Sequence, residues 1–266
     1  MSDNEKSPPI LVKREPPIGW AVFNRPQVRN ALNFETWRLV ADAVHELEED
    51  SSTRVIVFRG STPEAFAAGA DISEFPANRA DSGQAHLYRE TIDRSLRAIT
   101  DCPKPVIAMI SGPCVGGGVQ VAIACDLRFA ASTGRFGIPA GRLGLAYPFD
   151  SVVALTQLVG PAHACDILFS ARLFDAEEAL AMGLVNRVLE PTELEAFVRR
   201  YAGEIAANAP FTVAAAKASI RAALSDPARR DLASVAGMIE RCYDSEDYHE
   251  GVRAFLERRR PEFRGR

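Results

Sequence analysis

The chain has 266 residues, of which 47% are hydrophobic and 25% are charged, and its formal net charge is −4. This composition is typical of a globular protein with one large domain, or one domain and a modest appendage. The acidic balance argues against a nucleic-acid or anionic-membrane partner, because both require a basic field. The five scattered cysteines form no C-x-x-C pair, which favours reduced thiols in a cytoplasmic protein over a zinc or redox site.

The beginning of the chain is polar and has no apolar core. We therefore expect a disordered leader over residues 1–9 rather than a signal peptide. No uninterrupted apolar run is long enough to cross a membrane, so no membrane partner is expected. Strands are predicted at 10–13 and 20–23, followed by a helix at 34–48 that Asn33 caps.

The middle of the chain alternates strands with helices. Buried strands are predicted at 55–58 and 105–111, because these segments are largely apolar without alternation, and a further strand is predicted at 126–130. Helices are predicted at 84–99 and at 119–125, the second one opening at a run of three glycines. Strand, glycine turn, helix and strand in succession indicate an α/β fold.

The last third of the chain is mostly helical. Capping boxes that begin at Asp175 and at Thr192 predict two helix starts, with a strand at 184–189 between them. Helical periodicity alone then continues over 211–224, 231–243 and 248–259. We therefore predict an α/β core over residues 10–198 and a helical C-terminal region over residues 199–266.

Two segments rich in small residues are the main candidates for a site. They are 66–72, which reads FAAGADI, and the triple glycine 116–118 before a short helix. Small residues let the backbone approach a ligand closely, and an N–H at a helix N-terminus joined by a second N–H makes an anion site. The alternative is that both segments are tight turns. The four histidines are far apart in the sequence, so no metal site is expected.

The order and spacing of these segments resemble the crotonase (enoyl-CoA hydratase/isomerase) superfamily. The matching residues, in chain order, are Asn24-Arg25-Pro26, Asn30-Ala31-Leu32, Phe66 to Ile72, Lys104 to Ala108, Ser111-Gly112, Gly116 to Gly118, Cys125 to Arg128, Phe136 to Pro139, Leu143-Gly144-Leu145, Ala179 to Val185 and Phe255 to Arg259. The resemblance covers most of the chain.

The resemblance implies a spiral of ββα units with a C-terminal helical trimerisation region, as a homotrimer or a dimer of trimers. It also implies an acyl-CoA thioester as ligand, with no cofactor besides the coenzyme A that the substrate carries. The backbone N–H groups of Ala70 and Gly117 would form an oxyanion hole for the thioester carbonyl. The expected coenzyme A contacts are Val28, Arg29, Ala31, Ala68, Asp71 and Ile72. Arg29, with Arg258 or Arg259 from a neighbouring subunit, would meet the 3′-phosphate; for the tail arginines the alternative is a solvated helix face.

Two positions decide the reaction. The resemblance implies that hydratases carry one glutamate just after the triple glycine and another after an F-G-x-P segment. This chain has Gln120 and Ala140 there. A glutamine can orient water but cannot take a proton at neutral pH, and an alanine does neither. Since a general acid or base is worth ~10²–10⁴ in rate, we expect little hydratase activity.

Another group can replace the missing base. Asp150 is the only carboxylate in the short segment that directly follows residues 143–145, and its alternative role is to cap the helix predicted at 151–158. Tyr147 can donate a hydrogen bond to the acyl group or simply pack. Glu74 and Asp81 lie on the loop expected to cover the acyl chain, with a solvent-facing position as the alternative. Arg142 can pair with a carboxylate substrate, with an ordinary surface ion pair as the alternative.

Three functions remain in competition. The first is an enzyme that holds an acyl-CoA enolate and catalyses isomerisation, decarboxylation or thioester hydrolysis. The second is a non-catalytic acyl-CoA-binding protein. The third, an RNA-associated protein, is disfavoured by the acidic balance, which the short basic run Arg258-Arg259-Arg260 does not reverse.

Overall fold

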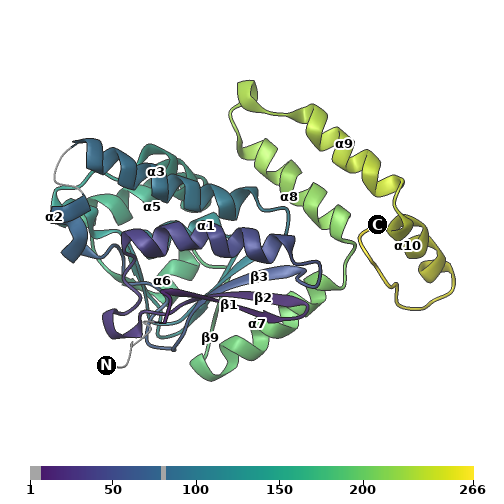
Figure 1. Ribbon diagram of the computed structural model, residues 1–266, viewed down its shortest axis with the longest axis horizontal. Helices are drawn as coiled ribbons and strands as arrows, with labels where there is room; N and C mark the ends of the chain where they lie inside the picture. Colours follow the sequence, from purple (N-terminus) through teal and green to yellow (C-terminus); the bar gives the residue numbers. More distant parts are fainter. Residues whose placement is uncertain (1–6, 79–81) are drawn as a thin grey trace, which may run out of the picture.

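The computed structural model describes residues 7–78 and 82–266 and confirms the α/β class (Figure 1). Residues 1–6 of the predicted leader, and the candidate Asp81, lie outside the described residues. The end of the leader is joined to the fold, because the Asn24 side chain donates to Ser7 Oγ at 2.9 Å and the Asn24 N–H donates to Pro9 O at 2.8 Å.

The main sheet has six strands in the order β1-β2-β3-β4-β6-β9. The β1–β2 pair is antiparallel, and every other neighbouring pair is parallel. These strands are β1 (Ile10–Glu15), β2 (Ile18–Phe23), β3 (Val55–Gly60), β4 (Val106–Ile110), β6 (Leu127–Ala131) and β9 (Arg187–Leu189). The strand predicted at 184–189 is therefore shorter than expected, because its first residues form the turn after a helix.

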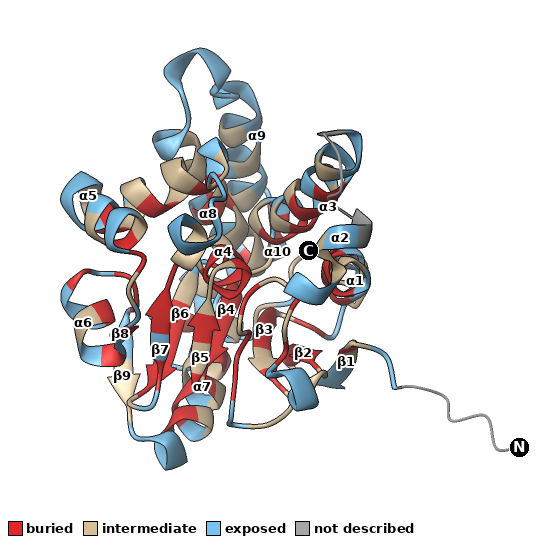
Figure 2. Ribbon diagram, turned by 90° about the vertical axis from the view of Figure 1, so that its left-hand side faces the viewer, coloured by how far each residue is buried: buried red, intermediate tan, exposed pale blue. Residues whose placement is uncertain are grey.

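The central strands are buried on both faces, as Figure 2 shows by colour. Along β3, Ile56 and Phe58 belong to the hydrophobic cluster on one face of the sheet, while Val55 and Val57 belong to the cluster on the other. The alternation follows from the pleat, which turns successive side chains to opposite faces. Helix α1 (Phe34–Glu49) contributes to the first cluster and α7 (Pro191–Ala206) to the second.

A second, three-stranded sheet was not predicted. It consists of β5 (Pro113–Val115), β7 (Arg135–Gly137) and β8 (Phe174–Asp175) in the order β5-β7-β8. Each strand has only two or three residues, too few for a periodic pattern. This sheet matters for the site because β5 leads directly into the glycine turn.

The remaining helices are α2 (Phe75–Asn78), α3 (Ser82–Asp101), α4 (Gly117–Ala124), α5 (Phe149–Ser170), α6 (Ala176–Ala181), α8 (Pro210–Leu224), α9 (Leu232–Tyr243) and α10 (Glu246–Leu256). Asn33 and Asp175 cap helices as predicted, accepting from the N–H groups of Thr36 and Glu178. The prediction for Thr192 is wrong. Proline at the first helical position starts α7 two residues earlier than the capping box predicts, so Glu190 is the N-cap and has no side-chain capping bond.

The predicted division at residue 198 falls inside α7. This helix is continuous, and Val198 and Ala202 are both buried in the cluster beneath the sheet. Helices α8, α9 and α10 extend away from this body (Figure 1). The Lys217 ammonium of α8 anchors them by donating to the carboxylate of Asp126 at 2.8 Å, and Lys217 is only 9% exposed.

Helix α5 has the length and composition expected of a membrane span, and 22% of its most apolar 18-residue stretch is buried inside the protein. A break at Gly160 divides it, since this residue has φ 77° and ψ 163° and is followed by Pro161. The two halves are thus too short to span a bilayer as one straight helix.

Candidate functional site

The two segments of small residues lie side by side. Ala67 pairs with Cys114 of β5 in a parallel bridge, and the Val115 N–H donates to Ala67 O at 2.9 Å. A second parallel bridge joins Leu32 to Ala70. Tertiary structure therefore brings the loop after β3 between the chain before α1 and the glycine turn before α4.

The glycines of the turn are required by close approach. Gly116 has φ +52°, a conformation that L side chains rarely adopt. A Cβ on Gly118 would lie 2.3 Å from the backbone oxygen of Ala67, and a Cβ on Gly117 would lie 2.9 Å from Cζ2 of buried Trp37. Only glycine lets α4 begin this close to the neighbouring loop.

The N–H groups of Ala70 and Gly117 have no backbone acceptor within the described part of the chain. In the bridge to Leu32, the bonds are made by the residues on either side of Ala70: Leu32 N donates to Gly69 O and Asp71 N donates to Leu32 O. The Ala70 N–H therefore points away from Leu32. Gly117 is the first residue of α4, where an N–H has no intrahelical partner.

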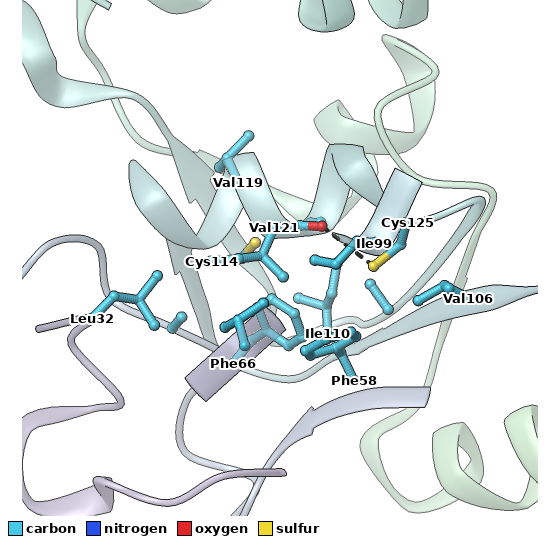
Figure 3. Packing of buried hydrophobic residues seen from close by; sticks show 14 of the residues in the cluster. Leu32, Phe58, Phe66, Ile99, Val106, Ile110, Cys114, Val119, Val121 and Cys125 are labelled. Carbon is cyan, nitrogen blue, oxygen red and sulfur yellow. Dashed lines mark hydrogen bonds between the residues drawn. The ribbon is translucent and has the colours of Figure 1, made fainter. Parts of the chain in front are cut away.

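The turn rests on a tightly packed core (Figure 3). Leu32, Phe66 and Cys114 are each 0% exposed. Complete burial raises the pKa of the Cys114 thiol well above its usual range, so this cysteine is a packing residue rather than a nucleophile. A rigid core beneath the two N–H groups fixes their direction.

Gln120, at the position where the resemblance implies the first hydratase glutamate, is held from one side. It is 6% exposed, and its Nε2 donates to the equally buried Ser151 Oγ at 2.9 Å. Sequence reasoning missed Ser151, because no local pattern pairs the first turn of α5 with α4. Ala140, where the resemblance implies the second glutamate, lies in a 3-10 turn (Pro139–Leu143) and packs against the main hydrophobic cluster.

Tyr147, like Ala140, packs against the main hydrophobic cluster. Its hydroxyl oxygen is buried and has no hydrogen-bond partner among the described residues. Burial raises the pKa of this phenol far above its usual range, with a smaller contribution from Cys114. A buried neutral hydroxyl without a partner is available to donate to a ligand.

Asp150 lies in the first turn of α5 and is exposed. The alternative that it caps this helix is wrong, because Pro148 is the N-cap and no side-chain capping bond is formed. Asp150 lies close enough to Asp93 of α3 to help raise that carboxyl's pKa, although burial of Asp93 is the larger cause.

The six residues expected at coenzyme A gather on one surface. The Ala68 N–H donates to Arg29 O at 3.0 Å, which joins the two segments that supply them. Val28 and Ile72 are 40% and 52% exposed, and Arg29 is also exposed. The side chain of Asp71 is occupied, because Ser73 and Arg25 bond to it and lower the pKa of its carboxyl. Arg25 also donates to Ala31 O at 2.6 Å.

Of the remaining candidates, Glu74 and Arg259 have structural partners. The Glu74 carboxylate accepts a hydrogen bond from the N–H of Phe34 at 2.9 Å. This carboxylate therefore caps the first turn of α1 and does not only face solvent. Arg259 pairs with Glu250 at 2.6 Å and also with Glu257. Arg142 and Arg258 are exposed. Among the described residues, no three His, Cys, Asp or Glu side chains converge as a metal site would require.

Known proteins are similar to this chain in sequence and in fold along nearly its whole length. The sequence profile of the Enoyl-CoA hydratase/isomerase family matches residues 15–266. The chain belongs to the enoyl-CoA hydratase/isomerase family. This confirms the resemblance to the crotonase superfamily.

The relatives agree in sequence and in structure. A crotonyl-CoA hydratase of Syntrophomonas wolfei is 34% identical over 254 residues, covering 96% of this chain and 97% of the relative. A short-chain-enoyl-CoA hydratase of Clostridium acetobutylicum is 34% identical and covers 95% and 96%. The crystal structure of an enoyl-CoA hydratase/carnithine racemase from Magnetospirillum magneticum is 40% identical, with a TM-score of 0.91 and coverage of 97% and 96%. The fold is therefore the crotonase fold, and the family acts on acyl-CoA thioesters.

Proposed function

We propose that the protein binds an acyl-CoA thioester and stabilises its enolate, and that its reaction is not hydration. The observation that carries the proposal is the juxtaposition of Ala70 and Gly117, whose N–H groups have no backbone acceptor in the described chain. Two preorganised donors on a rigid core can stabilise an oxyanion, and losing one such donor typically costs ~10²–10³ in rate. Gln120 and Ala140 leave the site without the two carboxylates expected of a hydratase.

Coenzyme A is proposed to lie along the surface formed by the six residues Val28, Arg29, Ala31, Ala68, Asp71 and Ile72. The exposed apolar side chains there suit the adenine ring, and the exposed Arg29 guanidinium suits the 3′-phosphate. Asp71 serves this surface by holding its loop through Ser73 and Arg25. The named relatives act on enoyl-CoA thioesters, which supports the same ligand class here.

Asp150 is proposed as the base and Tyr147 as a hydrogen-bond donor to the acyl group. Asp150 directly precedes Ser151, whose hydroxyl holds Gln120, so the three lie at one end of α5 and α4. An exposed carboxylate at neutral pH can remove a proton from the α-carbon, which isomerisation requires; decarboxylation or hydrolysis would instead use a group of the substrate or a water. The family's name does not decide among these reactions.

The test is mass spectrometry of a coenzyme A thioester panel incubated with the protein in D₂O. The panel contains saturated, 2-enoyl, 3-enoyl and carboxyacyl thioesters, so hydration, double-bond migration, decarboxylation, hydrolysis and α-proton exchange all change the mass or the retention. Exchange or a non-hydrated product supports the proposal. Rapid hydration of the 2-enoyl thioester would contradict it.

A matched pair of variants isolates the base. Asp150→Asn should abolish exchange and turnover while thioester binding by calorimetry is unchanged. Asp244→Asn, an exposed aspartate that ends α9, is the control and should behave as wild type. Binding without exchange or turnover for any thioester would favour the second candidate, a non-catalytic acyl-CoA-binding protein, which the loss of both glutamates supports.

We also propose that α8–α10 join copies of the chain into a homotrimer or a dimer of trimers. Large apolar side chains on these helices are exposed, including Ile220 at 62%, Leu232 at 63% and Phe255 at 84%. Patches of this kind on a protein surface usually mark an interface. Sedimentation equilibrium should give three or six chains per particle, and a monomer at micromolar concentration would refute the proposal.

A further inference from the structure

A cavity of about 290 Å³ lies where the C-terminal helices leave the body of the protein. One side is formed by the residues that lead into β3 and β4, and the other by the end of α7 and by α8 and α9. Figure 1 shows this junction as the place where α8 departs beside β3. The cavity does not include Ala70, Gly117 or any residue of the proposed coenzyme A surface.

The walls of the cavity are mainly apolar. Ile205 closes it from α7, Phe211 and Val213 from the first turn of α8, and Met238 from α9. Methionine and aromatic side chains adapt well to a hydrocarbon chain. Core and C-terminal helices thus contribute to a single apolar wall.

The charged side chains that line the cavity are all positive, beside the neutral polar side chains of Thr53 and Asn208. Among the described residues that line it, Arg54, Lys104 and Arg241 are cationic and none is an aspartate or glutamate. The Lys104 ammonium already has hydrogen-bond partners, because it donates to Leu47 O and Asp50 O at the end of α1. The two arginines therefore carry the charge that faces the cavity.

Neither arginine has a carboxylate within ion-pair distance in the part of the chain described. Nη2 of Arg54 donates to Phe263 O at 3.1 Å, but its Nη1 is buried and has no partner. The guanidinium of Arg241 lies over the Phe211 ring, 3.9 Å from its centroid. Because no described carboxylate neutralises either guanidinium, an anionic group in the cavity would meet uncompensated positive charge.

The start of α8 adds to the positive potential. The N-cap of this 15-residue helix is Ala209, which makes no side-chain capping bond, and Pro210 and Phe211 at its start both line the cavity. The uncapped end of the helix presents N–H groups and the positive end of its dipole. Two arginines and a helix N-terminus thus surround one apolar cavity.

We propose that this cavity binds a small amphiphilic carboxylate, with its carboxyl group on Arg54 and Arg241 and its hydrocarbon chain on the apolar wall. The volume sets the size of the ligand. At roughly 30 Å³ for each water-sized group, about ten non-hydrogen atoms fill the cavity, which corresponds to a straight-chain acid of about eight carbons. Since the walls come from both the core and the C-terminal helices, the ligand stabilises the junction between them.

The test is isothermal titration calorimetry of the full-length protein with sodium octanoate, in the presence of saturating coenzyme A to occupy the proposed active site. One octanoate should bind per chain and raise the thermal midpoint, because a ligand specific for the folded state stabilises it. Octan-1-ol, which has the chain without the charge, should bind at least tenfold more weakly.

Variants locate the binding. Arg241→Leu keeps an apolar contact with Phe211 but removes the charge, and should weaken octanoate binding at least tenfold. Arg200→Leu is the matched control, because Arg200 lies over Phe197 in the same way, 5.3 Å from its centroid, away from the cavity. Met238→Trp should fill the cavity and abolish binding.

The proposal fails if folded wild-type protein does not bind octanoate. It also fails if octan-1-ol binds equally well, or if neither Arg241→Leu nor Met238→Trp weakens binding. These outcomes do not depend on the coenzyme A panel, since octanoate binding is measured with the proposed active site occupied.

Discussion

Replacing Gly118 by alanine tests how closely the glycine turn is packed. The added Cβ would lie 2.3 Å from Ala67 O and 3.0 Å from Ala67 Cβ, whereas ordinary contacts begin at 3.4 Å. Both Gly118 and Ala67 are buried, and the closer atom belongs to the backbone, so no flexible side chain can move aside. The loop that carries Ala70 or the start of α4 must shift by about 1 Å.

The magnitude follows from two opposing effects. Overpacking of a well-packed core costs about 3 kcal/mol at the upper end of its usual range. Alanine in place of glycine inside a helix recovers about 1 kcal/mol. The net loss of about 2 kcal/mol should lower the thermal midpoint by roughly 4–8 °C for a chain of this size.

The same shift should disturb the proposed oxyanion hole. Misplacing a reacting group by about 1 Å costs about 10²-fold in rate, so α-proton exchange should fall by that factor. Gly203→Ala in α7 is the matched control, because nothing lies within 4 Å of its added Cβ, and it should raise the midpoint slightly. If Gly118→Ala were as stable and as active as Gly203→Ala, the packing argument would be refuted.

Three further predictions concern buried groups. Tyr147→Phe removes a buried hydroxyl without a described partner, so calorimetry should show about 1 kcal/mol of added stability while turnover falls; a loss of stability would show that the hydroxyl has a partner. Burial raises the pKa of Asp93 above its unfolded value, so its ionised form destabilises the fold at neutral pH and this cost disappears as the pH falls below the unfolded value. Asp93→Asn should therefore raise the thermal midpoint at pH 7 but not at pH 3, and equal shifts at both values would contradict the assignment. Burial raises the pKa of Cys125 to about 12, so a maleimide at pH 8 should label exposed Cys165 first; peptide mapping with early labelling of Cys125 would oppose this.

Much of the fold follows from local patterns. The spacing of apolar residues in α1 and the Asn33 cap depend on neighbours within a few turns, so the sequence predicts them well. The strand β3 is equally predictable from the sequence, because a strand that is buried on both faces requires an uninterrupted apolar run. The short strands β5, β7 and β8 are not predictable from local patterns, since the segments packed around them decide how they pair.

The sequence by itself determined the family, the α/β class and the identity of the small residues at the turn, because these depend on the order of motifs along the chain. Only the tertiary structure decided that Ser151 holds Gln120, that Asp150 leaves its own helix end uncapped and that Arg54 and Arg241 face one cavity. Each of these contacts joins or orients side chains on separate elements. Their geometry is set by how helices and sheet pack, and no periodicity within a single segment encodes it.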